Sequence, residues 1–100
     1  MSVSGTMAAG EYRTIAKEGV AVRGKVIGVN RITEMFIVKH EEGFSVVEPI
    51  GYLVEIGDEI TGNLDYEGPE VLYNVTQEIL MESAIIQAVV PTFEAAKRRI

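Results

Sequence analysis

A segment near the middle of the chain constrains the fold more than any other. Within residues 53–64, Leu53–Ile56 is apolar apart from one glutamate, and Gly57–Asp58 has the residue types of a tight turn. Every second residue of the range 60–64 then falls on one face of an extended chain. The segment predicts a strand, a turn and a second strand. Because the flanking sequence is also strand-like, this hairpin is expected to close a small β-barrel.

Alternation of apolar and polar residues predicts three further strands before this hairpin. They are Gly19–Asn30, Met35–His40 and Phe44–Glu48. Gly24 and Gly28 interrupt the first strand, and glycines inside a strand mark a bend, a bulge or a close backbone approach. The range Glu41–Gly43 is predicted to be a hairpin loop in which Gly43 takes a positive φ.

The C-terminal part of the chain is rich in β-formers over residues 71–90. We predict one strand near residues 71–75 and another near 79–90; a helix over 79–90 has compatible spacing, but the β-branched content favours a strand. After Pro91, Thr92 is suited to cap a short helix that packs on the barrel. The predicted fold class is all-β: a five- or six-stranded antiparallel barrel with a short C-terminal helix.

The length of 100 residues indicates one domain, expected over residues 11–100 after a mobile lead-in at residues 1–10. The absence of cysteine excludes thiol chemistry and disulfides. No apolar run approaches the roughly 20 residues that span a bilayer, so no membrane association is expected. The first ten residues lack the basic residue and apolar block of a secretory signal, so a cytoplasmic location is expected.

The charges are distributed unevenly along the chain. Residues 1–40 carry six Lys or Arg and three Glu, residues 41–93 carry eleven acidic and no basic residues, and residues 94–100 carry three basic and one acidic. One interpretation is a solvated acidic face that aids solubility. The other is a polarised surface, whose basic side binds an anion or whose two sides pair in self-assembly.

The order and spacing of four segments resemble those of a small OB-fold barrel of the S1 type. The segments are Val22–Val26, Met35–Val38, Glu42–Val46 and Val54–Ile60. The resemblance covers about residues 19–65. It implies a barrel that binds oligonucleotides across its second and third strands and the adjoining loops.

The basic residues of the first strands are the best candidates for binding. Arg23 and Lys25 share a strand face, Arg31 lies in the following loop, and Lys39 lies on the next strand. Phenylalanines stack on bases if exposed and belong to the core if buried. The candidate binding residues are Arg23, Lys25, Arg31, Phe36, Lys39, His40 and Phe44.

Catalytic chemistry finds little support in the sequence. His40 is the only histidine, and beside the turn residues Glu41 and Glu42 it is expected on the surface. A metal site needs three or four convergent ligands, and no nucleophile elbow or phosphate-binding glycine loop is present. Asp58 is interpreted as a turn residue. We therefore expect no enzyme activity, no metal and no cofactor.

The sequence thus predicts a non-catalytic interaction module that self-associates or binds a protein partner. This prediction depends on the polarised charge, the missing catalytic groups and the unpaired strand edges of a partly open barrel. The alternative is binding of single-stranded RNA or DNA, with an affinity that falls steeply with salt.

Overall fold

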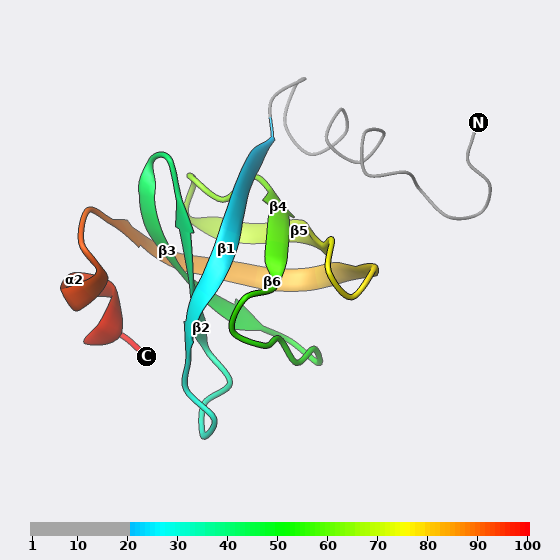
Figure 1. Cartoon of the computed structure of the whole chain (residues 1–100), viewed down its shortest axis with the longest axis horizontal. Helices are drawn as coiled ribbons and strands as arrows, with labels where there is room; N and C mark the ends of the chain where they lie inside the picture. The colour runs from blue at the N-terminus through cyan, green and yellow to red at the C-terminus, as the bar shows by residue number, and fades with distance from the viewer. Residues whose placement is uncertain (1–20) are drawn as a thin grey trace.

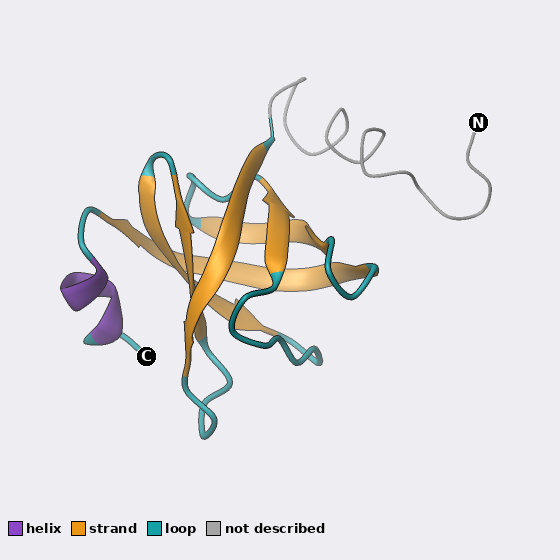
Figure 2. Cartoon of the chain, in the orientation of Figure 1, coloured by secondary structure: helices purple, strands orange, loops and turns teal. Residues whose placement is uncertain are grey.

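The structure is a computed structural model that describes residues 21–100. The predicted lead-in at residues 1–10, the start of the domain and the first residues of the strand from Gly19 lie outside the described residues. Within them lie six strands and one short helix (Figure 2). They are β1 (Val22–Val29), β2 (Phe36–His40), β3 (Gly43–Pro49), β4 (Glu59–Gly62), β5 (Gly68–Asn74), β6 (Ile79–Val90) and α2 (Phe93–Lys97).

The strands form a closed barrel in the order β1-β2-β3-β6-β5-β4, with β4 pairing back onto β1 (Figure 1). Every pairing is antiparallel. The predicted all-β class, the antiparallel barrel and the C-terminal helix are therefore confirmed, with six strands, and the barrel is compatible with an OB-like one. The expected unpaired strand edges are wrong, because closure gives each strand of residues 21–100 two hydrogen-bonded neighbours.

Strand β1 contacts both of its neighbours, β2 and β4, and its glycines permit this. A Cβ on Gly24 would lie 2.5 Å from the Val38 side chain and 2.6 Å from the Lys39 carbonyl oxygen. The register with β2 shifts between Val26 and Gly28, which marks a bulge. The two glycines therefore provide the close approach and the bulge that the sequence predicts.

The predicted hairpin over residues 53–64 is only half present. Its second half is β4, but Leu53–Ile56 is a loop and not a strand. The Asp58 carboxylate accepts the Glu55 N–H at 3.0 Å, and the Asp58 N–H donates to the Glu55 carbonyl at 3.0 Å. These local bonds occupy backbone groups that a strand would use in its ladder.

The apolar residues form two clusters on opposite sides of the barrel wall. The larger fills the barrel interior with Phe36, Ile60, Leu72 and their neighbours. The smaller lies outside the wall, where Ile37 and other residues of the sheet pack against α2. Strand β6 contributes to both clusters: Ile86 lies in the interior and Ala88 outside, because the register with β3 shifts between them. The strand over 79–90 is confirmed.

Helix α2 has the predicted cap and packing face. The Thr92 hydroxyl accepts the Ala95 N–H at 3.1 Å, and Phe93, Ala96 and Ile100 belong to the outer cluster. Within residues 21–100, no helix combines the length and the apolar character needed to cross a membrane.

Candidate binding surfaces

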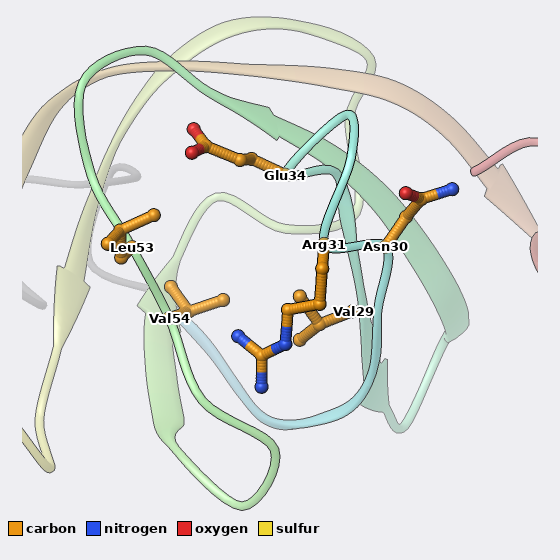
Figure 3. Close-up of a pocket in the computed structure, with 6 residues that line it drawn as sticks. All are labelled: Val29, Asn30, Arg31, Glu34, Leu53 and Val54. Atoms are coloured by element: carbon orange, nitrogen blue, oxygen red, sulfur yellow. The ribbon is translucent and has the colours of Figure 1, made fainter.

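Two loops lie side by side at one end of the barrel: residues 30–35 between β1 and β2, and residues 50–58 between β3 and β4 (Figure 1). A pocket of about 250 Å³ opens between them. In Figure 3, Leu53 and Val54 face Val29 and Arg31 across this pocket. The lining residues are Val29, Asn30, Arg31, Glu34, Leu53 and Val54. The pocket therefore has an apolar floor and charged groups at its rim.

Four large aliphatic side chains of these two loops are exposed, and Ile50 is the least exposed of them. The other three project furthest into solvent. Ile32 is 93% exposed, Leu53 is 65% exposed and Ile56 is 63% exposed. Together with the pocket, these three residues are called the loop surface below. Arg31 and Glu55 join the loops by an ion pair of 3.0 Å, with both side chains 62% exposed. Arg31, a predicted binding residue, thus belongs to the loop surface and not to the face that carries Lys25 and Lys39.

Side-chain hydrogen bonds hold the first loop in place. The Asn30 carboxamide oxygen accepts the N–H groups of Ile32 and Thr33 at 2.8 and 3.1 Å. Its amide nitrogen points away from the pocket and donates to the Ile100 carbonyl at 2.7 Å (Figure 3). Glu34 adopts a φ of 67°, a conformation uncommon for residues other than glycine. The loop is therefore built for a defined shape and is anchored to the segment after α2.

Asp58 holds the second loop. Its Oδ2 atom accepts the Glu55 N–H, the Asn74 amide at 2.9 Å and the Gln77 amide at 2.6 Å. Burial by itself raises the pKa of Asp58, but the hydrogen bonds from Asn74, Glu55 and Gln77 outweigh it, so that the pKa is lowered overall. The interpretation of Asp58 as a turn residue is too narrow, since Asp58 also ties the loop to β5 and the β5–β6 turn.

The outer side of β1 and β2 carries the other predicted cations. Lys25 and Lys39 are directly opposite each other in the β1–β2 register, and both are exposed. Arg23, two residues before Lys25, is exposed on the same side of β1. Lys39 is in turn directly opposite Phe44 of β3, which is half-buried. The sheet therefore brings Arg23, Lys25, Lys39 and Phe44 together, although they come from three strands.

Helix α2 extends this surface with two residues that the sequence analysis did not include. The rings of Phe44 and Phe93 have centroids 6.3 Å apart and are inclined at 52°. The Lys97 ammonium lies 5.6 Å from the centroid of Phe93. We call Arg23, Lys25, Lys39, Phe44, Phe93 and Lys97 the cation–aromatic face. The amphipathic pattern of α2 predicts that Phe93 packs on the barrel, but no sequence signal shows which strand it reaches.

Two predicted binding residues lie inside the structure. Phe36 is fully buried in the barrel core, so its ring is not available to stack on a base. His40 is only 8% exposed, which corrects the expectation of a surface histidine. Because side chains alternate along β2, Phe36, Val38 and His40 share the inward side, whereas Lys39 points outward. The alternation of side chains along β2 was therefore the sequence signal that His40 points inward.

His40 has a hydrogen-bond partner at each ring nitrogen. The Glu42 N–H donates to Nδ1 at 3.2 Å, and Nε2 lies 2.6 Å from the Ser45 hydroxyl, which itself donates to the Leu64 carbonyl. The pattern assigns the single proton of the neutral ring to Nε2. Burial lowers the pKa of His40, although the carboxylates of Asp65 and Glu42 act in the opposite direction. This arrangement gives His40 a structural role.

The charge asymmetry of the sequence becomes a spatial one in the fold. Every Lys and Arg of residues 21–100 lies on β1, β2, the loop between them, or in the C-terminal range 97–99. These elements are neighbours, because β1 pairs with β2 and Phe93 of α2 lies against Gly28 of β1. Strands β3 to β6 carry only acidic charged residues. The basic residues therefore gather on one side of the barrel.

Comparison with protein-family models, with curated proteins and with solved structures gave no match.

Proposed function

We propose that this protein is a non-catalytic interaction module that binds a protein partner through the loop surface. The observation that carries the proposal is the exposure of Ile32, Leu53 and Ile56 on two loops that flank one pocket. Single exposed aliphatic residues are common, but several of them on two adjoining loops, with Leu53 at the pocket itself, are typical of interaction sites.

The size and rim of the pocket favour a protein over a small molecule. Small-molecule sites usually enclose about 300–1,000 Å³, and this pocket of about 250 Å³ falls below that range. A pocket of this kind suits one anchoring side chain, as at the centre of many protein interfaces. The ion pair of Arg31 and Glu55 and the carboxylate of Glu34 supply a polar rim.

The loops are also held in shape before any partner binds. Asn30 fixes the first loop and Asp58 fixes the second through side-chain hydrogen bonds to backbone groups. A preorganised surface loses less conformational entropy on binding than a flexible one. The partner is a second copy of the chain or a different protein, and both would use this surface.

The OB-like class of the barrel is part of the same proposal. The bulged strand β1 that contacts both β2 and β4 supports it. An OB-fold has five strands and is partly open, whereas the barrel here has six strands and is closed.

A photo-crosslinking experiment tests the docking proposal in the cells from which the protein comes. Benzoylphenylalanine replaces Ile32 in one variant and Val71 of β5, which is also exposed, in the control. We expect one defined adduct, with a second copy or with another protein, from position 32 and not from position 71. The change Leu53→Ser should reduce this adduct strongly. Equal labelling from both positions, or an adduct that Leu53→Ser leaves unchanged, would contradict the proposal.

A further inference from the structure

We propose that the cation–aromatic face is a second binding site, for single-stranded nucleic acid, separate from the loop surface. It combines four cationic side chains with two neighbouring phenylalanine rings on one side of the barrel. This ligand class follows from the combination of cationic side chains and aromatic rings.

The two lysines at the centre of the face are placed unfavourably for the isolated protein. Lys25 and Lys39 are directly opposite in the register, where Cβ atoms lie roughly 4.5–5.5 Å apart and like charges repel. Glu59 stands on the other side of Lys25, and Glu41 follows Lys39 after one residue. However, the ion pair that the structure shows within residues 21–100 joins Arg31 to Glu55. Neither of the two lysines belongs to it. An anion bound between the lysines would remove this repulsion.

The aromatic side of the face adjoins these lysines directly. Along the outer side of the sheet, Lys25, Lys39 and Phe44 form one row across β1, β2 and β3. Helix α2 covers the next row, which contains Ile37 and Val46. The row of Lys25, Lys39 and Phe44 lies at the edge of the area that the helix covers. Phe93 stands at that border beside Phe44, and both rings are half-buried. Each ring is thus held by the protein while part of it remains accessible.

This combination distinguishes a single strand from other polyanions. Cations that follow a phosphate backbone beside rings on which bases stack are the usual means of binding single strands without sequence preference. A duplex hides its base faces, and inorganic polyphosphate has none. The rings would therefore contribute to binding only for a single strand.

Four cations also set the expected salt dependence. If Arg23, Lys25, Lys39 and Lys97 each neutralise one phosphate, log K should fall with log salt with a slope of about −3 for a single strand. Acidic residues surround the face: Glu59 is directly opposite Lys25, and β5 and β6 carry only acidic charged residues. They repel the remainder of a long polyanion. Short oligonucleotides are therefore the suitable probe.

Fluorescence anisotropy of labelled dT15 and rU15 with the full chain, between 20 and 200 mM salt, tests the proposal. We expect binding at 20 mM salt with the slope above. The double change Lys25→Gln and Lys39→Gln should weaken binding at least tenfold and reduce the slope by about 1.4. Phe44→Leu should weaken it about tenfold with no change in slope, because stacking releases no counterions.

The matched control removes the same amount of charge outside the face. Arg98→Gln with Arg99→Gln should weaken binding less than threefold, and circular dichroism should show that all variants are folded. Leu53→Ser should leave the affinity unchanged, so that failure of this proposal is distinguishable from failure of the docking proposal. No binding at 20 mM salt would overturn the inference. So would equal losses from the two double variants, or polyphosphate competing as well as dT15 while Phe44→Leu has no effect.

Discussion

Lys39 and His40 are adjacent in the sequence, yet the barrel wall separates their side chains. His40 lies inside with a partner at each ring nitrogen, and Asp58 elsewhere in the fold is likewise supplied with three donors. Lys39 lies outside beside another lysine and a half-buried ring. These two interior groups, His40 and Asp58, have their partners within the chain and serve the fold. Lys39 is exposed and takes no part in the ion pair that the structure shows within residues 21–100, so its ammonium group is available to a ligand.

The two phenylalanines of the predicted site give the sharpest form of this contrast. Phe36→Ala should lower the free energy of unfolding by about 3–5 kcal/mol, because it empties the barrel core. Phe44→Ala should cost less than half of that, since the ring is only half-buried. Urea denaturation of both variants measures the difference, and equal losses would contradict the division into inside and outside.

Asp58→Ala should have the next largest effect, a loss of about 2–3 kcal/mol, because it leaves the Glu55 N–H and the Asn74 amide without their acceptor. Glu67→Ala, at an exposed acidic residue, is the control and should change stability by less than about 0.5 kcal/mol. Both are measured by urea denaturation at pH 7. If the two variants behave alike, Asp58 is not a structural group.

The pH dependence of unfolding tests the neutral state of His40. Its pKa in the folded protein is below 6.5, so the unfolded chain binds the proton at a higher pH than the folded chain does. Stability should therefore be complete above about pH 6.5 and fall as the pH decreases from there, by at most about 1.4 kcal/mol per pH unit.

The control for this profile is His40→Gln, which is expected to be less stable at pH 7 but to lose the dependence between the folded and unfolded pKa values. Asp58 contributes in a different window, since its lowered pKa means that its stabilisation is lost only below its ordinary value of 3.8. Denaturation of both proteins between pH 5 and 8 measures the His40 effect. A wild-type curve that is flat below pH 6.5 would argue against a buried neutral histidine.

The smallest effect is expected from the ion pair on the loop surface. Arg31→Ala should change stability by less than about 1 kcal/mol, because both partners are mostly exposed and solvent screens them. A double-mutant cycle with Glu55→Ala measures the coupling between the two side chains. A coupling well above 1 kcal/mol would mean that the pair holds the loops together. It would contradict the view that only the interior charged groups stabilise the fold.

Much of the architecture follows from local patterns in the sequence. The alternation in Met35–His40 and in residues 79–90 predicts strands, and both are present. Thr92 caps the helix as its residue type predicts. The loop at Leu53–Ile56 could not be predicted in this way, because its apolar pattern matches a strand. Instead, the Glu55 N–H donates a hydrogen bond to the Asp58 carboxylate three residues later, and a hydrophobic pattern contains no information about such a bond.

The candidate site was predicted in part. The sequence places Arg23 and Lys25 on one strand face, and the fold adds Lys39 and Phe44 from the paired strands. It separates Arg31 and buries Phe36 and His40. Phe93 and Lys97 enter the site because α2 folds back over the outer side of the sheet. Nothing in the range 92–100 by itself shows that these residues lie beside Phe44.

The sequence alone determines most of the strands, the helix and the uneven distribution of charge, because these depend on residues that are close together in the chain. The tertiary structure decides that the barrel closes, in which register the strands pair and which side chains become neighbours. Lys25 meets Lys39, and β4 returns to β1, only because strands distant in the sequence pair in one particular register. A shift of that register by one residue would turn the cations inward and the core outward, so register determines which side chains a ligand can reach.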